Sequence, residues 1–202
     1  AHWVWETETF PKRWESSFQL FDEIWTPSRF CVEAISRRSP IPVLRVPYCI
    51  DPAAVQGQSG ERSRFGLADS DFLFLCAFDT LSVQERKNPF GVLEAFRQAF
   101  PSPGNCRLVL KINDADLAEE LMQRLRAAAE GAAVTFIEGT LTRQETSTLV
   151  AACDCFVSLH RSEGFGLMLA EAMLVNKPVI CTNYSGNTDF STSSSAFLVN
   201  YS

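Results

Sequence analysis

The sequence has no run of apolar residues that approaches the roughly 20 needed to cross a membrane. It also lacks an excess of positive charge, because 18 Lys and Arg face 24 Asp and Glu and the formal net charge is −6. Proteins that bind nucleic acids without sequence preference need a basic surface to displace counterions from the phosphates. We therefore expect no membrane-spanning segment and no nucleic-acid partner.

Histidine is scarce, with two residues, and the seven cysteines are odd in number. Cys153 and Cys155, separated by one residue, have the wrong spacing for a zinc knuckle, and two histidines are too few to help them. Several cysteines lie in apolar, strand-like runs, so we expect the buried, reduced thiols of a cytoplasmic protein and no metal site. The seven are Cys31, Cys49, Cys76, Cys106, Cys153, Cys155 and Cys181.

Two nucleotide-binding motifs are missing as well. The sequence contains neither the Gly-x-Gly-x-x-Gly dinucleotide fingerprint nor a phosphate loop that ends in Gly-Lys-Ser/Thr. Neither a hydride-transfer enzyme nor a P-loop NTPase is therefore supported. No signal peptide is visible, and the first residue is Ala1 rather than methionine.

What is present is the composition of an ordinary globular protein, with 46% hydrophobic and 21% charged residues among 202. A chain of this length buries roughly 70% of its unfolded surface, which suffices for one large domain and part of a second.

Residues 1–50 are unusually rich in tryptophan, with Trp3, Trp5, Trp14 and Trp25. Their pattern predicts a helix at about 12–21, a strand at 23–26, a helix at 28–36 capped by Ser28 and a strand at 43–46. We expect the incomplete end of a first lobe over residues 1–50. Glycine, proline and polar residues then predict a linker over 51–64.

From residue 65 to 202, apolar strands alternate with amphipathic helices. This order predicts an α/β fold, a Rossmann-like parallel sheet with helices on both faces. Ligands of such sheets bind outside the carboxyl ends of the strands. The expected strands are 72–78, 106–112, 133–137, 155–159, 178–182 and 196–199, and the expected helices are 89–100, 114–131, 142–153 and 166–175.

The sharpest motif follows the expected strand 155–159, where Glu163-Gly164-Phe165-Gly166 opens directly into a helix. Glycines allow a ligand to approach the backbone, and the free N–H groups of a helix start attract phosphate. The helix looks apolar all round, which predicts burial, and Glu171 is its one charge. A buried carboxylate needs partners, so Glu171 either pairs with a protein cation or faces a ligand rich in hydroxyls.

Other strand ends carry further polar groups. Arg86 and Lys87 precede the helix that starts near Pro89, where the helix dipole disfavours cations unless an anion docks between them. Alternatively, they are two exposed basic side chains. Lys111 ends a strand, where simple edge exposure is an equal alternative, and the loop 138–141 could form one wall of a base pocket.

Three strings together resemble the group 1 (family four) retaining glycosyltransferases of the GT-B fold. They are Ser162-Glu163-Gly164-Phe165-Gly166-Leu167, Glu171-Ala172-Met173 and Lys177-Pro178-Val179-Ile180, and two glutamates separated by seven residues are that family's mark. Arg86-Lys87-Asn88-Pro89 and the strand that ends in Lys111 agree with it. The likeness covers about 64–202 well, and residues 20–50 resemble the end of the first lobe.

The resemblance implies roles for these residues. Glu171 would bind the ribose hydroxyls, and Glu163 would hold the donor sugar and its β-phosphate together with the backbone of Gly164, Phe165, Gly166 and Leu167. Lys87, helped by Arg86, would neutralise the departing diphosphate. We count Lys111, Gly139, Thr140, Leu141 and His160 as further donor-binding candidates.

The resemblance also implies partners. The donor would be a nucleoside diphosphate sugar, and the acceptor a hydroxyl of a glycan, lipid or small molecule. No metal or other cofactor is expected, and peripheral membrane association would involve parts outside these residues. We expect the acceptor lobe to be almost wholly absent and the donor domain to be truncated at its C-terminus, so that the fragment alone is inactive.

The sequence departs from the family at two points and leaves alternatives open. The loop 79–82 lacks the frequent arginine, for which Arg86 is the expected substitute, and Met168 stands where proline is common. The alternatives are a non-catalytic nucleotide-sugar-binding module and another GT-B enzyme, such as a phosphorylase or an epimerase. A glycoside hydrolase that uses Glu163 and Glu171 is a third, which the apolar helix around Glu171 disfavours.

Overall fold

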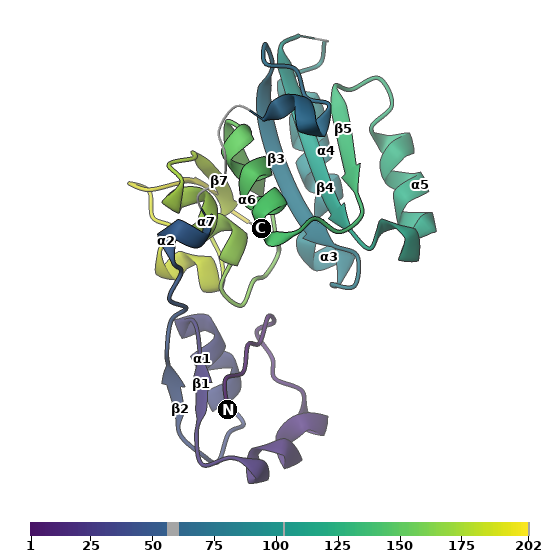
Figure 1. Ribbon diagram of the computed structural model, residues 1–202. Helices are drawn as coiled ribbons and strands as arrows, with labels where there is room; N and C mark the ends of the chain where they lie inside the picture. Colours follow the sequence, from purple (N-terminus) through teal and green to yellow (C-terminus); the bar gives the residue numbers. More distant parts are fainter. Residues whose placement is uncertain (56–60, 103, 202) are drawn as a thin grey trace.

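A computed structural model describes residues 1–55, 61–102 and 104–201. A small N-terminal lobe, purple to blue in Figure 1, lies below a larger α/β domain that contains the rest of the chain.

In the described part of the larger domain, six parallel strands form one sheet in the order β5-β4-β3-β6-β7-β8. The chain enters at the central strand β3, adds β4 and β5 on one side, and then returns to add β6, β7 and β8 on the other. The direction of winding therefore reverses between β3 and β6, which pair with each other. The strands are β3 (Phe72–Asp79), β4 (Cys106–Asn113), β5 (Val134–Glu138), β6 (Cys155–Ser158), β7 (Val179–Thr182) and β8 (Phe197–Val199).

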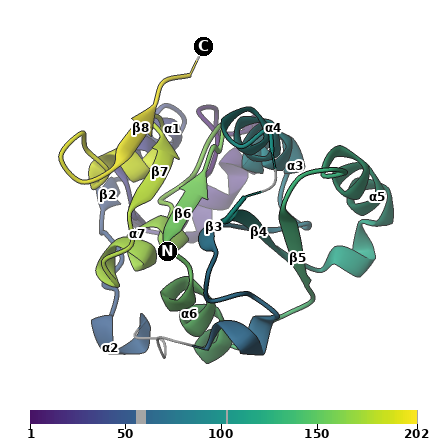
Figure 2. The same ribbon diagram turned by 90° about the horizontal axis from the view of Figure 1, so that it is seen from above.

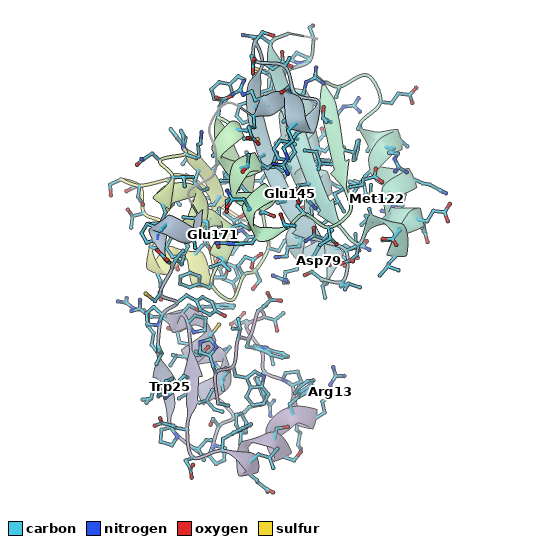
Figure 3. All side chains as sticks on the ribbon, viewed as in Figure 1. Arg13, Trp25, Asp79, Met122, Glu145 and Glu171 are labelled. Carbon is cyan, nitrogen blue, oxygen red and sulfur yellow. The ribbon has the colours of Figure 1, made fainter. Side chains whose placement is uncertain are left out.

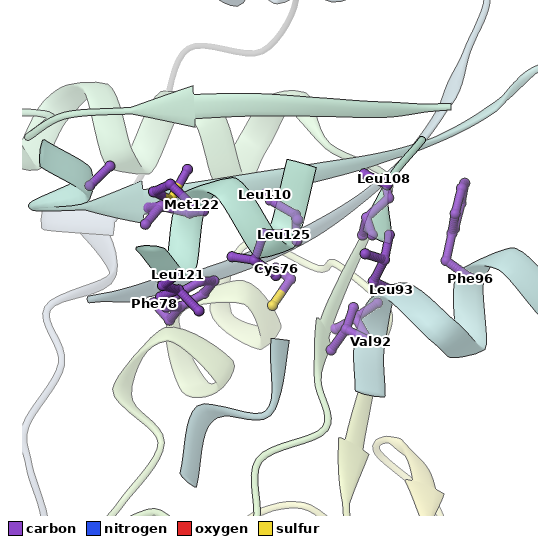
Figure 4. Close-up of a cluster of buried hydrophobic side chains, with 14 of the residues drawn as sticks. Cys76, Phe78, Val92, Leu93, Phe96, Leu108, Leu110, Leu121, Met122 and Leu125 are labelled. Carbon is purple, nitrogen blue, oxygen red and sulfur yellow. The ribbon is translucent and has the colours of Figure 1, made fainter. Parts of the chain in front are cut away.

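Helices cover both faces of this sheet, as the sequence pattern predicts (Figure 2). On one face, α4 (Pro89–Ala99) and α5 (Glu119–Ala128) bury a core that includes Leu93, Leu110 and Leu125 (Figure 4). On the other face, α6 (Arg143–Ala152) and α7 (Leu167–Leu174) pack on Leu75, Val109 and neighbouring side chains.

Local signals start several of these helices. Thr142 and Glu145 form the predicted capping box of α6, in which each side chain accepts from the other residue's backbone N–H. Asn88 caps α4 by accepting from the Gly91 N–H at 3.3 Å. Such caps satisfy N–H groups that have no partner inside the helix.

The N-terminal lobe contains the parallel pair β1 (Ile24–Thr26) and β2 (Val43–Arg45), with α1 (Arg29–Ser36) beside them. Ser28 caps α1, as predicted. The expected helix at 12–21 is instead the 3-10 helix η1 (Lys12–Leu20). Its Phe18 packs with Phe10 and Ile24, and the aromatic rings of Trp3 and Trp5 cover them.

Residues 51–64, the predicted linker, contain two short helices. The short helices α2 (Pro52–Val55) and η2 (Arg62–Phe65) lie within this range, and positions 56–60 lie outside the described residues. Arg62 binds the Asp154 carboxylate through Nη2 at 2.9 and 2.8 Å, so the end of this segment is fixed to the sheet domain.

The predicted helix 114–131 is wrong at its start. Asp114 adopts a left-handed conformation with φ of 50°, so a short 3-10 helix, η3 (Ala115–Leu117), precedes α5. Leu117 consequently points to solvent and is 67% exposed. A short helix that the pattern did not indicate, α3 (Gln84–Lys87), follows β3.

The cysteines follow the expectation of free thiols, most of them buried. Five of the seven are buried, Cys106 is partly buried and Cys49 is exposed. Among the described residues, no helix is both long enough and apolar enough to span a membrane.

Candidate functional site

The loops after β3 and β6 meet at the point where the winding of the sheet reverses. The Asn88 side-chain amide donates to the Leu159 carbonyl at 2.8 Å, and the Arg161 N–H donates to the Arg86 carbonyl at 2.8 Å. These bonds join the start of α4 to the turn before α7. Ligands of open parallel sheets bind at such a reversal, at the carboxyl ends of the strands.

Four charged side chains gather at this junction. Glu163 Oε1 lies 2.5 Å from Lys87 Nζ and 3.3 Å from Arg86 Nη1. Arg86 Nη2 lies 2.7 Å from a carboxylate of the N-terminal lobe, Glu6 Oε2. The family resemblance implied one site for Glu163, Lys87 and Arg86, and the structure brings the three side chains together.

A cavity of about 230 Å³ opens beside this cluster. The α7 N-terminus forms part of its wall, and no described side chain caps that helix. Free N–H groups at a helix start carry partial positive charge and attract anions, so Lys87 and α7 make this cavity a candidate anion site, in which the carboxylates of Glu6 and Glu163 balance the charge of the cations. Its lining residues are Glu6, Ala77, Lys87, Phe156, Ser158, Glu163, Gly166, Leu167, Met168 and Leu169.

Two glycines allow the turn between β6 and α7 to form, one within the turn and one in the loop after β7 that touches it. Gly166 has φ of +89°, a conformation that side chains disfavour. A Cβ on Gly186, in the loop after β7, would lie 2.1 Å from the Gly164 carbonyl oxygen, so the two backbones touch. Glu163 is held there as well, since its N–H donates to Ser185 Oγ at 2.8 Å and its carbonyl accepts from the Gly186 N–H at 2.9 Å.

The N-terminal lobe rests on the same turn. Ser28 Oγ donates to the Gly164 carbonyl at 2.5 Å, and the Cys31 thiol donates to it at 3.1 Å. Ser162 Oγ donates to the Glu6 carbonyl. The turn is therefore fixed from both sides, by the loop after β7 and by the first lobe.

His160 is fully buried, and its ring joins two loops. Nδ1 lies 3.0 Å from Ser158 Oγ, whereas Nε2 lies 3.0 Å from Asn187 Oδ1 and 3.3 Å from the Tyr184 carbonyl. Both neighbours of Nε2 are acceptors, so Nε2 carries the proton and Nδ1 accepts from the serine. Burial lowers the pKa of His160. Because both nitrogens are occupied, His160 positions the loops rather than lying open to a ligand.

Glu171 pairs with a protein cation, which is one of the two outcomes that its isolation predicted. Its Oε1 lies 2.7 Å from Nη2 of Arg143 at the start of α6, and the hydrogen bond to this carboxylate raises the pKa of Arg143. Glu171 lies where α6 and α7 meet (Figure 3), and its side chain is 6% exposed against 50% for that of Arg143. The helix is not buried all round, since Leu167 and Leu174 are 44% and 43% exposed.

Lys111 is buried rather than exposed at the strand end. Nζ donates to the Gly139 carbonyl at 2.6 Å and to Asn113 Oδ1 at 2.5 Å, and burial lowers the pKa of Lys111. Gly139 and Thr140 are exposed and line a separate cavity of about 680 Å³ with four acidic residues, while Leu141 packs on the core. Lys111 thus shapes the loop that was expected to flank a base.

Phe165 also plays a packing role. Its ring packs against Tyr48 and Phe190, with centroids 5.1 Å apart in each pair. In the described part of the chain, no group of three or more His, Cys, Asp or Glu side chains could hold a metal ion.

Sequence reasoning missed two side chains of the site. Arg143 and Glu6 become neighbours of Glu171 and Arg86 through tertiary contacts. A cation at the start of α6, where the helix dipole disfavours it, is the one local signal that pointed to Arg143.

Residues 80–199, more than half of the chain, match the family described as glycosyl transferases group 1. The chain belongs to this family. The match contains every candidate site residue that the sequence indicated, from Arg86 to Glu171, whereas Glu6 lies outside it. No curated protein matches the sequence significantly.

Solved structures show the same fold as this group 1 glycosyltransferase domain. HepE from Anabaena, solved with UDP-glucose, is 19% identical with a TM-score of 0.75, over 98% of this chain and 57% of that chain. A glycosyltransferase from Rickettsia africae is 13% identical with a TM-score of 0.76, over 96% and 54%. Sucrose-phosphate synthase from Thermosynechococcus elongatus is 18% identical with a TM-score of 0.75, over 92% and 47%. The chain therefore spans about half the length of these GT-B proteins.

Proposed function

We propose that this chain is the donor-binding part of a retaining glycosyltransferase that transfers a hexose from a nucleoside diphosphate sugar to a hydroxyl acceptor. The observation that carries the proposal is the anion site at the sheet reversal, where Lys87 and the uncapped start of α7 face one cavity beside Glu163. The Anabaena neighbour HepE, solved with UDP and with UDP-glucose, supports a nucleotide-sugar donor.

In the proposed transfer, each group of the site has a chemical role. When the bond between sugar and phosphate breaks, negative charge grows on the diphosphate, and fixed cations and dipoles aimed at it lower the barrier. Lys87 and the α7 N–H groups supply that charge, without a metal in this proposal. Glu163, fixed by Ser185 and Gly186, accepts hydrogen bonds from the sugar hydroxyls.

Glu171 would bind the ribose. Arg143 holds Oε1 of its carboxylate, which leaves Oε2 as an acceptor for the ribose hydroxyls. The exposed Gly139 and Thr140 would lie at the base end of the donor, on the loop that Lys111 fixes. The acceptor would be a glycan, lipid or small molecule.

A thermal-shift screen of this chain with UDP, GDP, ADP and their sugars tests the proposal. A nucleotide at 100 times its dissociation constant should add about 2.7 kcal/mol to the free energy of unfolding. One nucleoside diphosphate should stabilise the chain, and its free nucleoside should do so much less. The proposal fails if none of the nucleotides raises the melting temperature.

Lys87→Met should weaken the diphosphate about tenfold or more by calorimetry and leave the nucleoside unchanged, because it removes a charge that faces the phosphates. Lys12→Met, at an exposed position of η1, is the matched control and should change neither affinity. Equal losses for diphosphate and nucleoside would contradict the phosphate role of Lys87.

A further inference from the structure

Arg86 is buried and bound to three acceptors of the protein. The residue is only 6% exposed, and Nη1 donates to the Ser162 carbonyl at 2.9 Å and lies 3.3 Å from Glu163 Oε1. Nη2 lies 2.7 Å from Glu6 Oε2. Arg86 lies behind Glu6 and Glu163, which line the cavity, and an anion that takes over one of these hydrogen-bond positions replaces the acceptor that now holds it.

Glu6 is the acceptor that can move. Its side chain is 45% exposed and meets one cation, whereas the Glu163 side chain is 12% exposed and meets both Lys87 and Arg86. The backbone of Glu163 is also held by Ser185 and Gly186, on the far side of the turn. A half-exposed carboxylate recovers hydration when it leaves its partner, so its departure costs less than that of a buried one.

The charges of the cluster balance without a ligand. Arg86 and Lys87 contribute two positive charges, and Glu6 and Glu163 contribute two negative ones. A diphosphate that enters the cavity therefore meets a neutral set of side chains until a carboxylate withdraws. Glu6 lines this same cavity, although it is far in the sequence from Lys87 and Glu163.

We propose that Glu6 is a specificity-determining residue that occupies Arg86 in place of a phosphate and is displaced by the donor diphosphate. The inference rests on the proposed function, because the diphosphate is the anion that takes the place of Glu6. A diphosphate brings enough charge to compete with a carboxylate for the guanidinium, and a neutral or singly charged ligand does not. Glu6 thus restricts the site to highly charged donors.

Removal of the Glu6 charge should therefore strengthen anion binding, which is opposite to the effect of losing a structural contact. Calorimetry of Glu6→Gln should give about tenfold tighter binding of inorganic pyrophosphate and of UDP, with uridine unchanged. Glutamine keeps an acceptor for Arg86, so the fold is preserved. Glu8→Gln, on the same segment with a side chain 65% exposed, is the matched control and should bind all three ligands as the unaltered chain does.

The two proposals fail separately in this experiment. Unchanged or weaker pyrophosphate binding by Glu6→Gln would overturn the role of Glu6, as would pyrophosphate binding by neither protein. An equal gain in Glu8→Gln would overturn it too, because the effect would then be one of net charge. UDP binding no tighter than pyrophosphate binding would count against the proposed function and leave the Glu6 result standing.

Discussion

Gly186→Ala should destabilise the protein, because the loops after β6 and β7 touch through their backbones. The new methyl carbon would lie 2.1 Å from the Gly164 oxygen and 2.4 Å from its carbonyl carbon, whereas ordinary contact begins at 3.4 Å. Both neighbours are backbone atoms, so no side chain can rotate away. Overpacking of this kind costs typically 1–3 kcal/mol, and we expect the upper end, about 3 kcal/mol.

Urea unfolding measures the loss in the free energy of unfolding, and a thermal melting curve measures the fall in melting temperature. A loss of about 3 kcal/mol corresponds to a melting temperature lower by roughly 6–12 °C for a chain of this size. Gly104→Ala is the matched control, since a Cβ there meets no atom within 4 Å, and its stability should stay within about 0.5 kcal/mol. If Gly186→Ala is as stable as the control, the two loops are not in backbone contact and the described support for Glu163 is wrong.

Two further changes test the site. Arg143→Met should weaken UDP binding about tenfold, because Glu171 loses the cation that holds it. In a Glu171→Gln background the same substitution should have no further effect. An undiminished effect in that background would mean that Arg143 acts independently of Glu171. Burial lowers the pKa of His160 in the folded protein. As the pH falls, the imidazole of His160 is therefore protonated in the unfolded chain before it is protonated in the folded one. The contribution of neutral His160 to the free energy of unfolding should therefore be complete above pH 6.5, the ordinary pKa of histidine, and should decrease below it. Urea midpoints should show a smaller decline with falling pH in His160→Gln than in His2→Gln. Equal declines in the two variants would contradict the buried, neutral state of His160.

Local patterns predicted much of the sheet domain. The capping box at Thr142, the apolar strand at 72–78 and the glycine turn before α7 are short-range signals, and each specified its element. Alternation of strands and helices predicted that the loops with Lys87 and Glu163 lie at one edge of the sheet, and the family resemblance implied that both side chains serve the donor diphosphate.

The remaining features depend on contacts between distant parts of the chain. Burial of Lys111 follows from the Gly139 carbonyl, which is 28 residues away, and a strand pattern cannot indicate that partner. Asp114, whose carbonyl accepts from Thr80 Oγ1 at 2.7 Å, has a left-handed conformation and ends the predicted helix early at its N-terminal side. Glu6 reaches Arg86 through the packing of the first lobe on the turn, and no local motif marks that contact.

The most direct test of the account is a crystal structure of this chain with UDP or with the nucleoside diphosphate that the thermal screen selects. We predict the diphosphate within about 3 Å of Lys87 Nζ and of the α7 N–H groups, and the ribose hydroxyls against Glu171. Density for the nucleotide at any other place on the sheet domain, with Lys87 still bound only to Glu163, would contradict the central claim.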